Sequence, residues 1–266
     1  MPCLVCGDPR TIKSHLTPKA FTLDIKGAEK RAFEGSLAFE GPRFTQSGAF
    51  DRNILCEAHE RMLGDCDDYA VDWVRRIPSR AHTTHDGMML HMPNPRPDLL
   101  LKFVCSHVWR HAVSPRNRVY DMGLGPWEWR LRQLLFGAGS EYDPTFHIVR
   151  QRWTSEGVEL KELLIAPHRI PGQGTRCWEF DLGGLLWKLR LNERHVDRRL
   201  EGLKANGADP VPILVLDDRE LTDRPGTLEI AANMFRERYR QDQQANDGSP
   251  DRQPARTSAR ESGWPK

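Results

Sequence analysis

Four residues within the first 59 have the types and the spacing of metal ligands. Cys3 and Cys6 are separated by two residues, and so are Cys56 and His59. This spacing lets both side chains of a tight turn or a helix start reach one ion. Three thiolates and one imidazole match the tetrahedral coordination of structural Zn²⁺ sites, which leave no position open for a substrate. The spacing therefore predicts a structural zinc site.

The chain between the two ligand pairs is too long for a compact finger. It has 49 residues, so it should carry structure of its own. This layout predicts a treble-clef arrangement, with a knuckle at the first pair and the second pair at the start of a helix. Cys66, seven residues beyond His59, is interpreted as a structural thiol, although a different helix register would let it replace His59.

Other residues around these ligands resemble a known family. The stretches that are similar to zinc-supported HNH-type endonucleases are Cys3-x-x-Cys6-Gly7, Ser14-His15-Leu16-x-Pro18-Lys19-Ala20-Phe21 and Asn53-Ile54-Leu55-Cys56. This resemblance covers about the first 75 residues. More loosely, to about residue 200, the chain looks like a bacterial group of HNH-related proteins without an assigned activity, through Trp109-Arg110 and Leu124-Gly125-Pro126.

The resemblance implies a second metal ion and a catalytic histidine. In an HNH site, two strands and a helix hold Mg²⁺ or Mn²⁺ against a phosphodiester, and a histidine deprotonates the attacking water. His15 takes the position of this general base, and an unperturbed imidazole, which titrates at about pH 6.5, suits the role. Asn53 takes the position of an orienting residue, and Glu60 that of the helix ligand.

Two departures from the family pattern favour a module that does not cleave. Ser14 stands where the family has a carboxylate or a histidine, and a hydroxyl is a poor ligand for a hard cation. Glu60 stands where His or Asn is usual. Alternative interpretations also stay open, since His15 could bond a backbone carbonyl and Asn53 could form a turn. Glu60 could be a solvated residue near a helix N-terminus.

Basic residues could add a surface that binds nucleic acid. The formal net charge is only +2, so a phosphate backbone would have to meet a local patch. The expected members of the patch are Lys19, Arg110, Arg116, Arg118, Arg130 and Arg132. An ordinary charged surface with ion pairs is the alternative. His107 and His111 share a helix face and are interpreted as packed or hydrogen-bonded histidines.

The composition predicts a cytoplasmic protein without a membrane segment. The chain has 266 residues, 38% hydrophobic and 29% charged. No apolar run approaches the ~20 residues that span a bilayer, and the N-terminal residues lack the pattern of a secretory signal. Six cysteines, four of them in the first 66 residues, fit metal ligation in a reducing compartment better than disulfides.

Hydrophobic periodicity predicts an α+β protein. The zinc-binding unit should cover residues 1–78, an α+β domain of unassigned role residues 93–242, and a disordered polar tail residues 243–266. The second region should begin with two helices, over roughly 98–113 and 125–136. Asp98 is the expected N-cap of the first. A mostly β part and a final helix should follow them.

The leading hypothesis is a metal-dependent endonuclease acting on DNA or RNA, and the resemblance suggests phage or mobile-element defence as its setting. His15 would be its base, with Glu60 and Asn53 serving the site. The alternative is a non-catalytic zinc-binding module that recognises nucleic acid or a protein partner. Either could act as a homo-oligomer.

Overall fold

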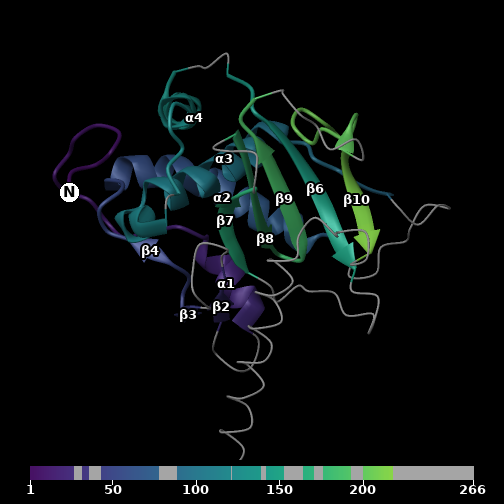
Figure 1. Cartoon of the computed structure of the whole chain (residues 1–266), viewed down its shortest axis with the longest axis horizontal. Helices are drawn as coiled ribbons and strands as arrows, with labels where there is room; N and C mark the ends of the chain where they lie inside the picture. The colour runs from purple at the N-terminus through teal and green to yellow at the C-terminus, as the bar shows by residue number, and fades with distance from the viewer. Residues whose placement is uncertain are drawn as a thin grey trace, which may run out of the picture.

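The computed structural model gives an α+β fold in which a mixed six-stranded sheet packs on helices (Figure 1). At this level the expected fold class is confirmed. The structure describes residues 1–26, 32–35, 43–77, 89–120, 122–138, 142–152, 164–170, 176–192 and 200–217. The expected final helix and polar tail lie outside these residues. Within the described ranges, no helix is both long and apolar enough to cross a membrane.

The first part of the chain folds as a turn, two short strand pairs and two helices. In chain order the elements are β1 (Ser14–His15), α1 (Lys19–Lys26), β2 (Ala32–Glu34), β3 (Arg43–Thr45), β4 (Phe50–Asp51) and α2 (Glu57–Arg75). Strand β1 pairs antiparallel with β4, and β2 pairs antiparallel with β3. Helix α2 confirms the helix expected after the second ligand pair, with Cys56 as its N-cap residue.

Two further helices confirm the apolar segments expected in the middle of the chain. They are α3 (Pro97–Val113) and α4 (Trp127–Phe136), with a 3₁₀ helix (Pro115–Tyr120) between them. The expected cap of α3 is wrong, because the helix begins at Pro97, whose missing N–H is no loss at a first helical position. Asp98 therefore lies inside the first turn, where it pairs with Arg96 at 3.0 Å.

The large sheet contains one parallel and four antiparallel pairings. Its strands are β5 (Met89–Met92), β6 (Thr145–Arg152), β7 (Ile165–Arg169), β8 (Cys177–Leu182), β9 (Leu185–Arg190) and β10 (Val211–Asp217). Their order is β5-β10-β6-β9-β8-β7, and only β10 and β6 run parallel. Strand β5 begins in the interval between the two regions expected from the sequence, residues 1–78 and 93–242, where no strand was predicted.

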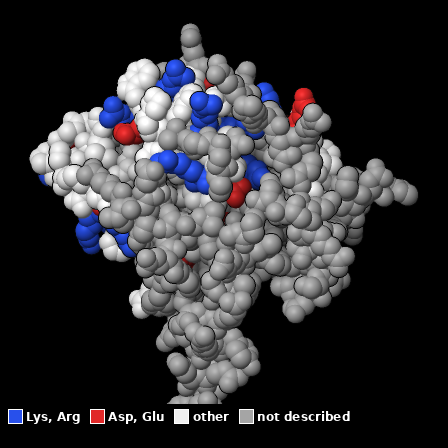
Figure 2. Space-filling model, in the orientation of Figure 1, with Lys and Arg blue, Asp and Glu red and all other residues white. Residues whose placement is uncertain are grey.

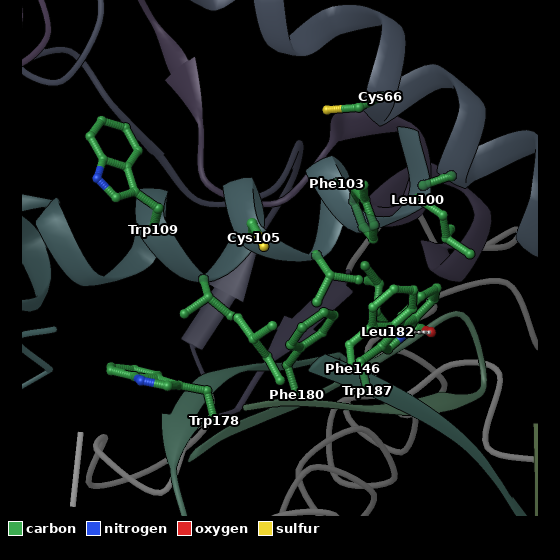
Figure 3. Packing of buried hydrophobic residues seen from close by; sticks show 14 of the residues in the cluster. Cys66, Leu100, Phe103, Cys105, Trp109, Phe146, Trp178, Phe180, Leu182 and Trp187 are labelled. Carbon is green, nitrogen blue, oxygen red and sulfur yellow. Dashed lines mark hydrogen bonds between the residues drawn. The ribbon is translucent and has the colours of Figure 1, made fainter. Parts of the chain in front are cut away.

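Helix α3 forms a middle layer between the sheet and α2, as Figure 3 shows from close by. On the sheet side, the Trp187 ring lies flat against Phe180 and edge-on to Phe103, with centroids 5.8 and 5.7 Å apart. The Trp187 indole N–H donates to the carbonyl of Leu182 at 3.1 Å. Burial of each such side chain contributes roughly 1.5–3 kcal/mol. One buried apolar cluster runs from the first ligand pair to β10, so the two parts of the chain share a core.

Candidate functional site

The predicted metal ligands come together in one cluster. The donor atoms of Cys3, Cys6, Cys56 and His59 all lie within 4.8 Å of one another. The sulfurs of Cys6 and Cys56 are 3.8 Å apart, and Nδ1 of His59 lies 3.2 Å from the Cys56 sulfur. A tetrahedral zinc ion with Zn–S of about 2.3 Å and Zn–N of about 2.0 Å puts its ligand atoms about 3.5–3.8 Å apart. These side chains, here called the four-ligand cluster, therefore fit a metal ion such as zinc.

Local backbone geometry forms the first half of this cluster. Gly7 has a φ of +77°, and its N–H donates to the Cys3 carbonyl at 2.9 Å, which closes the first ligand pair into a tight turn. Glycine adopts such left-handed backbone at little cost. The N–H of Leu4 donates to the carbonyl of Ile54 at 2.9 Å, which fixes the turn beside the start of α2.

The surroundings of the cluster act differently on its thiols. Burial raises the pKa of the Cys3 thiol, but hydrogen bonds from the N–H groups of Cys6, Cys56 and Val5 and from the Cys6 side chain together lower it. The Asp8 N–H lowers the pKa of the Cys6 thiol, but burial and the neighbouring thiols outweigh it and the pKa is raised. A lowered pKa favours the thiolate, which is the form that binds metal. The His59 ring meets Phe136 of α4 edge-on, with centroids 5.4 Å apart. Packing thus holds the imidazole in place.

Cys66 is not part of the cluster. It is completely buried, and its Sγ donates to the carbonyl of Leu63 at 3.0 Å. Burial raises the pKa of the Cys66 thiol to about 12, so it stays protonated. Its interpretation as a structural thiol is confirmed, and it does not take the place of His59.

The residues that correspond to an HNH-type site also meet. Ser14 and His15 lie on β1, and Glu60 lies in the first turn of α2. The Ser14 hydroxyl donates to Glu60 Oε2 at 2.5 Å, and the main-chain N–H of His15 donates to the same carboxylate. Burial raises the pKa of Glu60, while Arg110 and Ser14 act against the shift. Glu60 therefore connects α2 to β1 through these two hydrogen bonds.

His15 carries a neutral imidazole. Burial lowers its pKa to about 4, and the nearby cations Lys13 and Arg110 add to the shift. The ring Nε2 is shielded from solvent and has no hydrogen-bond partner in the described ranges. The ring lies edge-on to Phe50, with centroids 6.4 Å apart. A neutral imidazole can accept a proton, but a pKa this low makes it a weak base.

The expected catalytic Mg²⁺ or Mn²⁺ does not fit this donor set. Hard cations prefer several oxygen ligands, and Glu60 is the only carboxylate among the three HNH-like residues. Its oxygens already accept hydrogen bonds from Ser14 and His15, and the nearby charge of Arg110 opposes a cation. In the described part of the chain, only the four-ligand cluster brings together three or more His, Cys, Asp or Glu donors at ligand distance.

Three side chains of α3 hold the segment that carries His15. Arg110 Nη1 donates to the carbonyl of His15 at 3.0 Å, and His107 Nδ1 donates to the next carbonyl along the chain at 3.0 Å. His111 Nε2 lies 3.3 Å from the hydroxyl of Thr17. Because these α3 positions share one helix face, one side of α3 contacts three consecutive residues, His15 to Thr17. The packed-histidine interpretation of His107 and His111 is confirmed.

The structure corrects one expected member of the nucleic-acid surface. Arg110 is 0% exposed, and its guanidinium bonds both carboxylate oxygens of Asp67, at 2.6 and 2.9 Å. Burial would lower the pKa of Arg110, but Asp67 outweighs burial and the pKa is raised, so the guanidinium stays charged. Arg110 is enclosed because α3 lies between the sheet and α2. It is a structural cation that cannot meet a phosphate backbone.

Asn53 forms a turn. Its main-chain N–H and its side-chain amide both donate to Asp51 Oδ1, at 2.8 and 3.3 Å. Its Oδ1 accepts a hydrogen bond from the amino group of Met1 at 3.0 Å. These contacts engage both ends of the amide and favour the turn interpretation over an orienting role toward His15.

A basic surface surrounds Phe50 on β4. Lys13 Nζ lies 4.1 Å from the centre of the Phe50 ring, and the Arg52 guanidinium carbon lies 6.0 Å from it. Arg116 Nη1 donates to the Phe50 carbonyl at 2.9 Å. None of these three cations pairs with a carboxylate of the described residues. The four residues are called the Phe50 patch. Sequence reasoning missed Lys13 and Arg52, although they directly flank β1 and β4.

The other expected basic residues are spread over several elements. Lys19 is exposed at the start of α1, and Arg130 is exposed on α4. Arg132 Nη1 donates to the carbonyl of Leu4 at 3.0 Å, which ties α4 to the turn of the first ligand pair. The side chain of Arg118 lies outside the described residues. The structure therefore places Lys19 on a different helix from Arg130 and Arg132.

A row of ionisable side chains crosses the large sheet on the face opposite α3. His147, Lys188, Glu179 and His168 stand in register on β6, β9, β8 and β7, and all are buried. Glu179 Oε1 lies 3.3 Å from His168 Nε2, and its Oε2 lies 3.8 Å from Lys188 Nζ. The other His168 nitrogen donates to the carbonyl of Ala166 at 3.1 Å. His168 thus connects Glu179 on β8 to the backbone of β7.

Comparison with known proteins adds no assignment to this geometry. The chain matched no protein-family model, no curated protein and no solved structure. Its chemistry has to be derived from the four-ligand cluster, the residues around His15 and the Phe50 patch.

Proposed function

We propose that the chain binds nucleic acid through the Phe50 patch, on a treble-clef unit stabilised by zinc in the four-ligand cluster. The observation that carries this proposal is the gathering of Lys13, Arg52 and Arg116 around Phe50 without a carboxylate partner in the described ranges. Cations placed in this way gain free energy by releasing counterions from a phosphate backbone. Proteins that bind single strands combine such cations with an aromatic ring.

Zinc would contribute to this function by fixing the geometry of the patch. Lys13 and Arg52 lie between the two ligand pairs, on segments that the β1–β4 pairing joins. A treble clef combines three parts: a turn with two metal ligands, a strand pair, and the start of a helix with the other two metal ligands. Loss of zinc would let these parts separate, because metal binding of this kind is also folding energy.

The binding test uses a fluorescently labelled duplex and fluorescence anisotropy over a range of salt concentrations. Wild-type affinity should fall linearly with salt on logarithmic axes. Lys13→Gln and Arg52→Gln should each weaken binding and reduce the slope by about 0.9, the value for one lost phosphate contact on duplex DNA. Both side chains lie at the surface or near it, so the variants should fold.

Arg61→Gln is the matched control. Arg61 is also an exposed arginine of the first part of the chain, but its guanidinium pairs with Glu57 at 2.8 Å. Binding should therefore be unchanged in this variant. An equal loss of affinity in Arg61→Gln and Arg52→Gln would show that binding depends only on overall charge. Absence of binding by the wild type would refute the proposal.

Metal-dependent cleavage is the second candidate function. The meeting of Ser14, His15 and Glu60 on β1 and α2 favours it, as does the neutral His15 imidazole. The donor set around Glu60 argues against it, because one engaged carboxylate beside Arg110 is a poor site for Mg²⁺. We therefore expect binding without cleavage.

The cleavage test compares wild type with His15→Ala on plasmid DNA and on RNA, with Mg²⁺ or Mn²⁺. Neither protein should cut above the background of the reaction without protein. Cutting by the wild type that disappears in His15→Ala, with zinc content unchanged, would establish the endonuclease and assign its base.

A further inference from the structure

Helix α4 presents an exposed tryptophan. Trp129 is 59% exposed, although tryptophan is usually buried over most of its surface. The helix itself is anchored by Leu131 and Leu135, which are buried in the core. Trp129 therefore does not hold α4 in place, and its ring is available to a ligand.

The next residue along the helix, Arg130, supplies a cation whose position is fixed by packing on two aromatic rings. The Arg130 guanidinium carbon lies 5.0 Å from the centre of the Trp127 ring and 5.7 Å from that of Tyr142. These two rings stack on each other, with centroids 6.0 Å apart and planes 22° from parallel. Arg130 is exposed and has no carboxylate partner among the residues that the structure describes. The aromatic shelf thus orders a positive charge on α4, one residue along the chain from Trp129.

Helix α4 and the segment that carries Arg52 both contact the turn of the first ligand pair. Arg132, two residues beyond Arg130, donates to the carbonyl of Leu4. The N–H of Leu4 in turn donates to the carbonyl of Ile54, two residues beyond Arg52 of the Phe50 patch. On the face shown in Figure 2, Lys and Arg side chains lie around α4 with few Asp and Glu among them. The turn thus connects α4 to the segment that carries Arg52 of the Phe50 patch.

We infer that α4 binds single-stranded nucleic acid, with an unpaired base stacked on Trp129 and the adjacent phosphate at Arg130. The inference rests on the proposed function, because the same strand would continue to the Phe50 patch. An exposed ring and an ordered cation on the same helix match the alternating base and phosphate of a single strand. In a duplex the bases are stacked on one another, so the ring would find no free base face. The charge of Arg130 favours this polyanion over an apolar protein partner.

The test measures binding of labelled oligothymidylate and of a labelled duplex by anisotropy at one ionic strength. Trp129→Ala should raise the dissociation constant for oligothymidylate by about 5- to 150-fold, the range for loss of one stacked base. Affinity for the duplex should not change. Trp129→Phe should restore most of the single-strand affinity, because a phenyl ring still stacks. Met62→Ala, at another exposed apolar side chain (42% exposed), should change neither affinity.

The results separate this inference from the proposed function. If Trp129→Ala leaves the affinity for oligothymidylate unchanged while Arg52→Gln weakens both ligands, the inference is overturned and the proposed function stands. If the wild type binds neither ligand, both are overturned. Equal losses for duplex and single strand in Trp129→Ala would also overturn the stacking of an unpaired base.

Discussion

The guanidinium of Arg110 is fully enclosed, and Asp67 balances most of its charge, with a smaller contribution from Glu60. Asp67 accepts two of its hydrogen bonds, while the carbonyl of His15 and the hydroxyl of Ser106 accept others. Removing one partner of a buried ion pair leaves an uncompensated charge in a medium that solvates it poorly. Stability should therefore be sensitive to this pair in a way that surface pairs are not.

Asp67→Ala should lower the free energy of unfolding by about 3–5 kcal/mol, the range for breaking a buried pair. Asp24→Ala is the matched control, because Asp24 pairs at 2.8 Å with Arg75 and both side chains are more than a third exposed. Its loss should lie below about 1 kcal/mol. Urea denaturation followed by circular dichroism measures both. Similar losses in the two variants would show that the Arg110 pair is solvated.

The four-ligand cluster acts at the scale of elements, because it joins the first turn of the chain to the start of α2. Zinc in this cluster would hold two segments that are otherwise linked by few backbone hydrogen bonds. Structural zinc contributes roughly 10–16 kcal/mol of binding energy in finger peptides. The position of β1 and β4 should therefore depend on the metal.

Wild-type protein should contain one zinc ion per chain, and Cys6→Ser should lose most of it. Cys6 is the exposed ligand, so the exchange should disturb the core little. Cys66→Ala is the control, since its thiol lies outside the cluster and the variant should keep its zinc. Elemental analysis after gel filtration gives the stoichiometry. Zinc retained in Cys6→Ser but lost in Cys66→Ala would reverse the ligand assignment.

Features with a local signal could be predicted from the sequence. The ligand pairs are such a case, because each is fixed by a spacing of two residues. Helices α2, α3 and α4 also follow from apolar residues that recur within a few positions. Strand β5 could not be predicted in this way, because the strand that it pairs with in the described part of the chain, β10, lies about 120 residues further along.

The candidate site was predictable only in part, for a related reason. Arginine side chains are usually exposed, and for this reason the sequence predicted Arg110 on the surface. One feature of the sequence argues against exposure of Arg110. Helix α3 is apolar on nearly all sides, which indicates a helix that is buried all round. Lys13 and Arg52 converge only because β1 pairs with β4, and each strand has two residues. Strands this short leave no periodicity to recognise.

At the scale of the whole molecule, buried histidines couple stability to pH. Burial lowers the pKa of His107 to about 3 and that of His147 to about 4, and it lowers the pKa of His111 well below its usual value. In the unfolded chain each would titrate at about 6.5. Between about pH 4 and 6.5 the unfolded state therefore binds more protons, and stability falls as the pH falls through this window. The raised pKa of Glu60 acts in the opposite direction.

The free energy of unfolding should be lower at about pH 5.5 than at about pH 7.5. A fully buried histidine such as His107 contributes about 1.3 kcal/mol to this difference. His107→Asn cannot take up the proton, so its difference should be smaller than that of the wild type by this amount, even if the variant is less stable at both pH values. Urea denaturation at the two pH values, in zinc-loaded protein, measures it. An unchanged difference would show that His107 is already charged in the folded state.

The pairing of β5 with β10 has a consequence for the order of events during synthesis. Among the described strands, β5 lies at the edge of the sheet, and its neighbour β10 leaves the ribosome about 120 residues later. At about 5–20 residues per second, the interval is roughly 6–24 s. During this time the backbone groups of β5 have no strand of the sheet to pair with, and an open edge can template contacts between chains. Pro93, Pro95 and Pro97 follow the strand directly, and residues without an N–H limit how far such a contact can extend while the nascent chain waits for its partner.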